Sequence, residues 1–488
     1  MKLQFSNPIY AGQDPFVCKG PDGRYYGVAE SPDSRQIEVF GSDTLTDRGV
    51  RRIAFTAFDS GKCSADLWAP EIWYLQGKWY IYFAGAEGRG MPWWQTHRMF
   101  VLEADEPLGP YRFCGELELG EHMSIDGTVM ELPDGRLVFI YMRSYEGENT
   151  LFMAPMSSPT KISGEPVLLS KPDHPWEADI NEGAFPIVRN GKVSLMYAAN
   201  AAHLPQYCLA LLHCTDPENV LDPSVWVKEE TPILTAQKDI IGPGHACIVP
   251  SPDGSEDWLL FHSKFDYDDS LPGGWNRVIN LHKLTWDEND RPVFAPLKAR
   301  GEKMNVPAGQ KPAASGTAVE VNPGQTPDLW QEFAYYRCHT VFYEPEGLYL
   351  KGTAAPDYGD KVLLRDAVYR DFELECRIFP VTGESGLLLR VDNPATGRYL
   401  WEGIGVMLTP DSWRVVSCDG KALAELASGS LPGAGEQLLR LFAFGDRLSL
   451  WIGDTQLCTL QIPNVPGRIG FGTLGGDGRF SHLQIKPV

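Results

Sequence analysis

The sequence predicts an all-β protein, with a five-bladed β-propeller over about residues 1–300 and a β-sandwich of the jelly-roll type over residues 326–488. Three observations lead to this prediction: a hairpin-like pattern that recurs five times, about four strand-like stretches in each repeat, and a stretch rich in Pro, Gly and Ala at residues 301–325. Repeats of this size with four strands each are typical of propeller blades. A chain of 488 residues is also too long for one hydrophobic core.

Five turn glycines mark the first part of the chain. They follow one another at intervals of 54, 58, 56 and 63 residues, at Gly23, Gly77, Gly135, Gly191 and Gly254. Each lies between a half-apolar stretch and a nearly all-apolar one, such as KWYIYFAGA after Gly77, as expected when the second strand is buried on both faces. Asp-Gly, Asn-Gly and Gln-Gly pairs at these points are typical of hairpin turns. Each repeat is therefore predicted to begin with a hairpin.

The second part of the chain is predicted to form a separate domain. Residues 301–325 have the composition of a linker. Beyond them, alternating stretches such as SGLLLRVDN and EQLLRLFAFGDRLSLWIGD predict the strands of a sandwich. Carbohydrate binding, a loop lent to a pocket, dimerisation and simple stabilisation of the propeller all remain open as its role.

Charge and composition narrow the choice of partners. The formal net charge of −21 argues against a nucleic-acid backbone or an anionic membrane and is compatible with a neutral substrate. The sequence has no apolar run of the length of a membrane span. Its first residues lack an apolar signal region, and its ten cysteines are scattered without a Cys-x-x-Cys pair. These two features lead us to expect a cytoplasmic protein with reduced cysteines.

A second regularity concerns the residue nine positions before each turn glycine. These residues are Asp14, Trp68, Asp126, Glu182 and His245. In a propeller the first strand of each blade lines the central channel, so residues at matching positions should face one another there. Burying a carboxylate is costly unless it is hydrogen-bonded or used in chemistry. Three carboxylates in one ring therefore favour a reaction that needs acids of different strengths.

Glycoside hydrolysis is such a reaction. An inverting enzyme needs one carboxylic acid to protonate the leaving group and one carboxylate, about 6.5–9.5 Å away, to activate water. A third carboxylate nearby can raise the pKa of the acid by repulsion between like charges.

The first part of the chain resembles glycoside hydrolase family 43. The resemblance rests on Gln13-Asp14-Pro15, Trp68-Ala69-Pro70-Glu71, Ser124-Ile125-Asp126-Gly127, Asn181-Glu182-Gly183 and Gly242-Pro243-Gly244-His245, in this order. It implies that Asp14 is the general base, that Glu182 is the general acid, and that Asp126 orients Glu182 and raises its pKa.

The resemblance also implies a set of substrate-binding residues. Trp68 would form an apolar wall of the sugar site, and Arg277 would reach the sugar or Asp126. The other candidates are Ile125, within the third motif, Phe185, two residues after the fourth motif, and Trp94, in the loop GRGMPWWQTHR. His245 would help to hold a structural calcium ion in the channel, while the chemistry itself would require no cofactor.

The predicted function is that of an inverting, exo-acting glycoside hydrolase that releases terminal α-L-arabinofuranose from short neutral arabino-oligosaccharides. The stretch INEGAFPIVRNGKVSLMYAANAA resembles members of the family that act on such substrates. A β-D-xylosidase acting on xylo-oligosaccharides and a non-catalytic carbohydrate-binding propeller are the alternatives. The second domain resembles the concanavalin-like and laminin-G-like sandwiches that are often attached to carbohydrate enzymes, and a homo-oligomer is compatible with these predictions.

Overall fold

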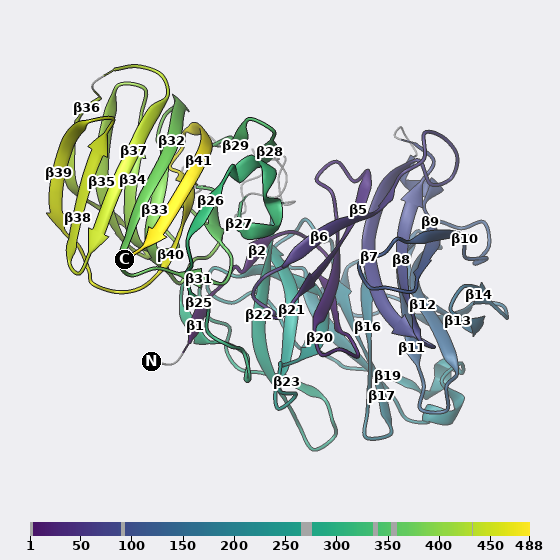
Figure 1. Ribbon diagram of the computed structural model, residues 1–488. Helices are drawn as coiled ribbons and strands as arrows, with labels where there is room; N and C mark the ends of the chain where they lie inside the picture. The colour runs from purple at the N-terminus through teal and green to yellow at the C-terminus, as the bar shows by residue number, and fades with distance from the viewer. Residues whose placement is uncertain (1–2, 89–92, 265–275, 335–339, 353–358, 432) are drawn as a thin grey trace. The chain divides into compact units, whose positions relative to one another are not determined.

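The computed structural model describes residues 3–88, 93–264, 276–334, 340–352, 359–431 and 433–488 (Figure 1). The chain forms two compact units. One consists of Gly12–Ala299 with Pro307–Gln310, and the other of Met1–Ala11, Arg300–Val306 and Lys311–Val488. In the described residues, no helix is long and apolar enough to cross a membrane.

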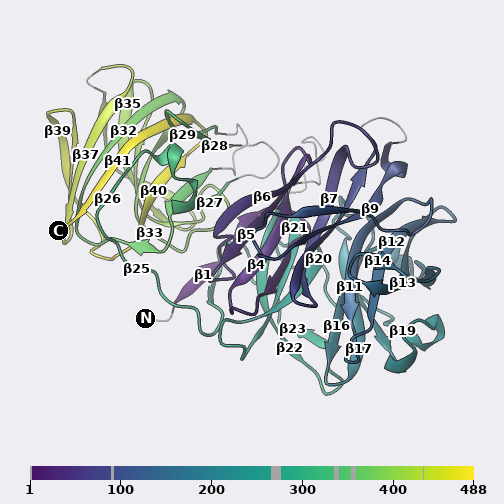
Figure 2. The ribbon, with the colours of Figure 1, turned by 45° about the vertical axis from the view of Figure 1, so that its right-hand side comes forward.

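The first unit is a five-bladed β-propeller, as the sequence predicts (Figure 2). Blade 1 contains β3 (Phe16–Lys19), β4 (Tyr25–Glu30), β5 (Gln36–Ser42) and β6 (Val50–Thr56). Blade 2 contains β7 (Ala65–Leu75), β8 (Lys78–Ala86), β9 (Arg98–Ala104) and β10 (Arg112–Glu116). Blade 3 contains β11 (Ser124–Glu131), β12 (Leu137–Tyr145), β13 (Glu148–Ser158), β14 (Lys161–Ile162) and β15 (Val167–Ser170). Blade 4 contains β16 (Asn181–Arg189), β17 (Lys192–Ala199), β18 (Cys208–Cys214) and β19 (Trp226–Lys228). Blade 5 contains β20 (Ile241–Pro250), β21 (Asp257–Lys264), β22 (Arg277–Trp286) and β23 (Pro292–Phe294).

The first strands of the blades form a closed ring. Each of β3, β7, β11 and β16 contacts the first strand of the next blade, and β20 contacts β3. The second strands are buried almost throughout, which explains their nearly continuous apolar sequence. Apolar side chains from adjacent blades pack together, as Tyr82 of β8 does with Phe139 of β12. Hydrophobic packing between blades therefore holds the ring together.

Every inner strand from blade 2 to blade 5 contains a β-bulge. In blade 3 the bulge lies between Ile125 and Thr128, and in blade 4 it lies between Glu182 and Phe185. The bulges contain residues with left-handed backbone conformation, among them Asp126 (φ 54°) and Gly183 (φ 53°). A bulge turns side chains out of the regular alternation of a strand, and bulges are common next to active sites.

The second unit is a sandwich of two antiparallel sheets. Its first sheet contains β28 (Val341–Glu344), β29 (Gly347–Leu350), β41 (Asp477–Pro487), β32 (Phe372–Thr382), β37 (Gln437–Phe444), β38 (Arg447–Ile452) and β39 (Thr455–Gln461), with β26 (Val319–Val321) paired to β41. The second sheet contains β27 (Trp330–Phe333), β30 (Lys361–Leu364), β40 (Arg468–Thr473), β33 (Ser385–Asp392), β34 (Glu402–Leu408), β35 (Ser412–Asp419) and β36 (Leu423–Ser430).

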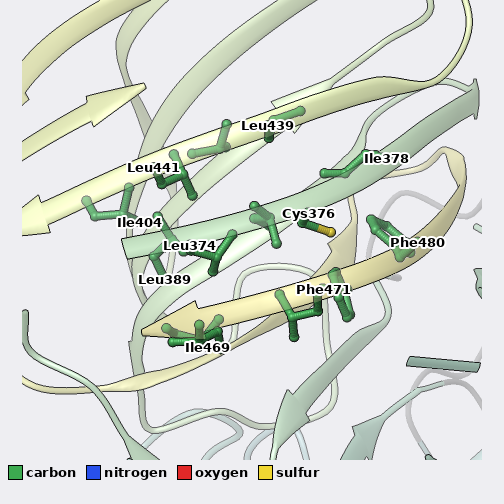
Figure 3. Packing of buried hydrophobic residues seen from close by; sticks show 14 of the residues in the cluster. Leu374, Cys376, Ile378, Leu389, Ile404, Leu439, Leu441, Ile469, Phe471 and Phe480 are labelled. Carbon is green, nitrogen blue, oxygen red and sulfur yellow. The ribbon is translucent and has the colours of Figure 1, made fainter. Parts of the chain in front are cut away.

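Apolar side chains from both sheets fill the space between them (Figure 3). Leu374, Cys376 and Ile378 of β32 alternate with polar residues that point outward. This period of two is the pattern expected when one face of a strand is buried.

The stretch that was predicted as a linker, residues 301–325, also contains short strands. They are β24 (Lys303–Asn305), which pairs with β1 (Gln4–Ser6), β25 (Ala314–Ser315), which pairs with β31 (Ala367–Val368), and β26. Because β26 is a strand of the sandwich, part of this stretch belongs to the second unit. The remaining elements are β2 (Tyr10–Ala11) and the 3-10 turns η1 (Trp93–Thr96), η2 (Pro175–Glu177), η3 (Pro217–Asn219), η4 (Pro223–Val225), η5 (Pro323–Gln325) and η6 (Pro327–Leu329).

Candidate active site

The five residues of the offset-nine pattern lie at or next to the inner strands, but not all at equivalent positions. Asp14, Asp126 and His245 have left-handed backbone conformations, with φ of 46°, 54° and 42°. In blades 2 and 4 the left-handed residue is the next one, Ala69 or Gly183. Trp68 and Glu182 therefore lie one residue before the left-handed position. The prediction of five matching positions was wrong in this detail.

The cause lies in the hairpin turns. Blades 2 and 4 close with two-residue turns, such as Asn190-Gly191, in which both residues have positive φ. Blades 1, 3 and 5 have longer turns, as between Glu131 and Leu137 in blade 3. Counting back from the glycine therefore reaches different points of the bulge.

Asp14 is surrounded by three basic side chains. Its Oδ1 lies 3.0 Å from Nη1 of Arg277, 3.0 Å from Nδ1 of His262 and 3.3 Å from Nδ1 of His245. The ion pair of Arg277 with Asp14 is a contact that the resemblance did not imply, and the predicted role of Arg277 toward the sugar stays a prediction. Burial by itself raises the pKa of the Asp14 carboxyl, but His245, Arg277 and His262 outweigh it and hold the pKa well below its ordinary value.

Arg277 provides the permanent positive charge beside Asp14. Burial lowers the pKa of His245, and it lowers the pKa of His262 to about 3. Both imidazoles are therefore neutral near pH 7. Asp14 is thus an ionised carboxylate paired with the guanidinium of Arg277, and its backbone N–H donates to Nδ1 of the neutral His262 at 3.2 Å.

Glu182 has a different environment. Its Oε1 accepts a hydrogen bond from the hydroxyl of Tyr207 at 2.9 Å. Burial raises the pKa of Glu182 to about 7, and the charge of Asp14 raises it as well, while the bond from Tyr207 and the charge of Arg277 act in the opposite direction. Near neutral pH this carboxyl can therefore be either protonated or ionised.

Asp126 lies next to both of these groups. Its Oδ2 accepts the backbone N–H of Gly183 at 3.0 Å, so it contacts the residue that follows Glu182. His245 Nδ1 lies 3.3 Å from Asp14 Oδ1 and 3.9 Å from Asp126 Oδ2, so these two oxygens are within about 7 Å of each other. Burial raises the pKa of Asp126 well above its ordinary value, and the charges of Glu182 and Asp14 raise it further.

Gly183 is required where it stands. Its φ of 53° is a conformation that favours glycine. A Cβ at this position would lie 2.9 Å from the ring of His245. The residue after Glu182 therefore has to be small for Asp126 and His245 to approach it.

Another carboxyl, the buried Glu71, lies further along the inner strand of blade 2. Trp73 Nε1 donates to its Oε2 at 3.0 Å. Burial raises the pKa of Glu71 to about 8. Glu71 pairs with Tyr82 across the bulge, as Phe185 pairs with Met196 in blade 4, so it lies beyond the bulge rather than at it.

The predicted substrate-binding residues occupy different surroundings. Trp68 stacks on His97 with ring centroids 4.0 Å apart. Ile125 occupies in blade 3 the position of Glu182 in blade 4, directly before the bulge, and is buried. Phe185 packs against Phe16 at 5.9 Å. Trp94 is part of η1, but its side chain lies outside the described part of the structure, so its role stays a prediction.

His245 is placed as a partner of carboxylates rather than as a metal ligand. Across the described residues, no group of three or more His, Cys, Asp or Glu side chains is arranged to hold a metal ion. The ring of His245 instead lies between Asp14 and Asp126. The calcium prediction is therefore not supported.

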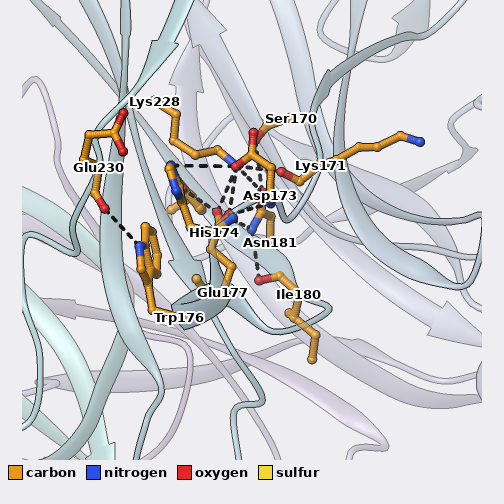
Figure 4. Close-up of polar contacts among 12 residues, drawn as sticks. Ser170, Lys171, Asp173, His174, Trp176, Glu177, Ile180, Asn181, Lys228 and Glu230 are labelled. Carbon is orange, nitrogen blue, oxygen red and sulfur yellow. Dashed lines mark hydrogen bonds and ion pairs between the residues drawn. The ribbon is translucent and has the colours of Figure 1, made fainter.

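A network of hydrogen bonds fixes the start of the strand that carries Glu182 (Figure 4). Its centre is Glu177, whose side chain is completely buried. Asn181 Nδ2 and the Tyr197 hydroxyl donate to Glu177 Oε1, each at 2.8 Å, and Lys228 Nζ lies 3.0 Å from the same atom. The backbone N–H groups of residues 173 and 174 donate to Oε2 at 2.8 Å. Asn181 directly precedes Glu182, so this network anchors the backbone beside Glu182.

Reasoning from the sequence missed Tyr207 and His262. Their rings stack at 5.4 Å, and Tyr207 contacts Glu182 while His262 contacts Asp14. Tyr207 precedes β18 and His262 lies on β21, so neither belongs to the repeated position on the first strands. The one available signal was that His262 interrupts the apolar run DWLLFHSK.

Comparison with known proteins agrees with this geometry. The family model of glycosyl hydrolases family 43 matches residues 5–292. Two curated relatives are named extracellular exo-alpha-(1->5)-L-arabinofuranosidases. The one from Streptomyces chartreusis is 30% identical over 53% of this chain and 82% of its own length. The one from Streptomyces avermitilis is 33% identical over 61% of this chain and 65% of its own length, which is just under two thirds. The crystal structure of an alpha-L-arabinofuranosidase from Lactobacillus brevis, 28% identical, matches 61% of this chain and 98% of its own length with a TM-score of 0.56.

These names overturn one expectation. The two Streptomyces relatives are named extracellular, so the prediction of a cytoplasmic protein is contradicted. That prediction rested on the first residues of the chain and on unpaired cysteines, and neither feature reports directly on location.

The matched region contains the first three strands of every blade and all the carboxyls described above, and it makes up more than half of the chain. The protein is accordingly a glycoside hydrolase, and it belongs to glycosyl hydrolases family 43.

Proposed function

We propose that this protein releases terminal α-L-arabinofuranose from arabino-oligosaccharides, with inversion at the anomeric carbon. The observation that carries the proposal is the contrast between two carboxyls of the inner ring, Asp14 and Glu182. The pKa of Asp14 is held well below its ordinary value, whereas that of Glu182 is raised to about 7. Two carboxyls whose environments separate their pKa values are the signature of a base and an acid.

Each carboxyl has a separate task in the proposed mechanism. Asp14, ionised and oriented by Arg277, accepts a proton from the water that attacks the anomeric carbon. Glu182, protonated, donates its proton to the leaving oxygen, so that the glycosidic bond breaks as the bond to water forms. Asp126 positions the backbone next to Glu182, because its Oδ2 accepts the N–H of Gly183. The sugar pocket would include Trp68, Ile125 and Phe185, with Trp94 at its edge.

Support for arabinose comes from the names of the relatives, both of which specify an arabinofuranosidase. Acid–base hydrolysis of this kind uses carboxyl groups alone, so the chemistry requires no cofactor. A calcium ion at His245 is not part of the proposal.

Substrate and stereochemistry can be tested together. The expected result is rapid cleavage of nitrophenyl α-L-arabinofuranoside and slow cleavage of nitrophenyl β-D-xyloside, with the first product detected by proton NMR as the inverted anomer. Single-sugar products from arabino-oligosaccharides would support the exo mode. A preference for the xyloside would replace arabinose by the alternative substrate, and a trapped covalent glycosyl-enzyme would refute the inverting mechanism.

A further inference from the structure

The outer face of the sandwich contains a groove. All of its lining residues come from the second unit. It is formed by β32, β37, β38 and β41 and has a volume of about 520 Å³. We call it the sandwich groove and define it by Glu375, Arg440, Phe442, Trp451, Asp454 and Lys486, which are among its lining residues. A volume of this size lies in the range of ligand pockets, roughly 300–1,000 Å³.

The alternation of the strands sets which side chains line this groove. On β37 the residues Leu439, Leu441 and Ala443 point into the core, so Arg440 and Phe442 point outward. On β38 the half-buried Trp451 lies between the buried Leu450 and Ile452. The sandwich does not need these outward side chains for its core, yet they include two large aromatic rings.

Three of the charged side chains that line the groove form ion pairs. Arg440 Nε lies 2.9 Å from Glu375 Oε2, and Arg440 Nη1 lies 3.4 Å from Asp454 Oδ1. His482 Nε2 lies 3.2 Å from Glu375 Oε1. Acidic and basic groups nearly balance along this surface, although the whole chain has a net charge of −21. A balanced surface with fixed donors and acceptors suits a neutral ligand with many hydroxyl groups better than a polyanion or a cation.

The aromatic side chains fit the same class of ligand. Phe442 is 36% exposed, and its neighbour Phe444 on the same face is 54% exposed. Trp and Phe rings provide apolar surfaces on which the C–H faces of a sugar can pack, while the polar groups beside them bind its hydroxyls. A groove lined by Trp451 and Phe442, with the ion pair of Arg440 and Glu375 beside them, combines both requirements.

We propose that the sandwich groove binds a neutral oligosaccharide, with sugar rings packed on Trp451 and Phe442 and hydroxyls bound by Arg440 and Glu375. The identity of this oligosaccharide as an arabinan chain rests on the proposed function. A second site on one chain raises the effective concentration of a long substrate at the first site and leaves the cleavage of a single-sugar substrate unchanged.

The test uses the full chain in the Glu182→Gln background, so that the probe is not consumed. Calorimetric titration with linear arabino-oligosaccharides is expected to give two sites per chain, and Trp451→Ala is expected to leave one. Phe442→Ala, at a more exposed position, provides a second variant in case Trp451→Ala does not fold, and it should weaken the same site at least fivefold. Phe379→Ala is the control, because Phe379 is an exposed aromatic on the same face of β32 that does not line the groove.

In the active enzyme, Trp451→Ala should raise KM for the long oligosaccharide five- to tenfold and leave kcat/KM for the nitrophenyl arabinofuranoside unchanged. A single site in the titration that is insensitive to Trp451→Ala and Phe442→Ala would overturn the groove proposal. So would a shift from dimer to monomer in these variants without any loss of sugar binding. If the nitrophenyl arabinofuranoside is not cleaved while the groove still binds oligosaccharide, the proposed function fails and the groove remains.

Discussion

The centres of the two units differ in what they bury. The space between the two sheets of the sandwich is filled by apolar residues such as Leu389, Ile404 and Phe471, which are fully or almost fully inaccessible to solvent (Figure 3). The charged side chains that this unit buries, such as Lys361 and Arg390, donate to backbone carbonyl oxygens. The inner ends of the propeller blades bury Asp126, His245 and other groups that face one another as possible acids and bases. Burying charge weakens a fold unless partners compensate for it, whereas apolar burial stabilises it. The comparison teaches that apolar packing stabilises the sandwich, while the centre of the propeller gives up stability for chemistry.

The largest effect is expected at Glu182. Glu182→Gln keeps the size of the side chain but cannot deliver a proton, so kcat should fall by about 10³. Sugar binding should persist, and stability should not fall, because a neutral amide is easier to bury than a carboxyl. Steady-state kinetics measures kcat, and calorimetric titration measures sugar binding. Glu131→Gln, at an exposed position on β11, is the matched control and should keep full activity. Retained turnover in Glu182→Gln would refute the assignment of the acid.

A core substitution in the sandwich should instead lower stability and leave activity unchanged. Leu389→Ala removes a fully buried side chain, so the free energy of unfolding of this unit should fall by about 2–5 kcal/mol. The rate of cleavage of a nitrophenyl glycoside should not change. Urea unfolding and kinetics test this pair of expectations. The exposed Leu426→Ala should change stability by less than about 0.5 kcal/mol. Loss of turnover in folded Leu389→Ala would show that the two units do not have separate roles.

Two buried glutamates sharpen the comparison within the propeller. Glu177 accepts hydrogen bonds from backbone and side chains and pairs with Lys228, while Glu71 has a pKa raised to about 8. Glu177→Gln leaves Lys228 without its buried partner and should lower the free energy of unfolding by about 3 kcal/mol.

Glu71→Gln should instead remove a dependence of stability on pH. The folded-state pKa of Glu71 lies above the unfolded value near 4.5, so the stability that its protonated form contributes is complete below pH 4.5 and is lost as pH rises through 8. The variant resembles the protonated form and should be more stable than the parent at pH 8 and similar to it at pH 4.5. Urea unfolding of variant and parent at pH 4.5 and at pH 8 measures this difference in stability. Equal stability of variant and parent at pH 8 would contradict the raised pKa.

The smallest effect is a shift of the pH profile. Glu182 must be protonated to act as the acid, so kcat/KM should fall as pH rises through about 7. The Tyr207 hydroxyl stabilises the ionised form of Glu182. Tyr207→Phe should therefore move the alkaline limb to higher pH by roughly one pH unit. If the alkaline limb of the kcat/KM profile does not move in Tyr207→Phe, a group other than Glu182 determines it.

Much of this architecture could be predicted from the sequence because it is repeated. Turn pairs such as Asn190-Gly191 and apolar second strands recur in five blades, and local chemistry determines both. The same counting found Asp14, Asp126 and Glu182, which lie close to one another in the structure.

The rest depends on contacts that no repeat describes. Tyr207 contacts Glu182 although it does not lie on the first strand of a blade. His262 contacts Asp14 from the second strand of blade 5. The ion pair of Arg277 with Asp14 joins residues 263 positions apart in the sequence. Packing between distant segments determines such pairs, and local patterns therefore cannot reveal them.

The bulge in the inner strands has a consequence for how such an enzyme can change. Turns of two residues close blades 2 and 4 and longer ones close the others, yet a left-handed residue lies at the bulge in each of blades 2 to 5. The position of the left-handed residue at the catalytic end of the strand therefore does not depend on the length of the hairpin turn at the other end. Insertions and deletions at the turns can accumulate during evolution without displacing the acid, so one side of the blade can diversify while the reaction is preserved.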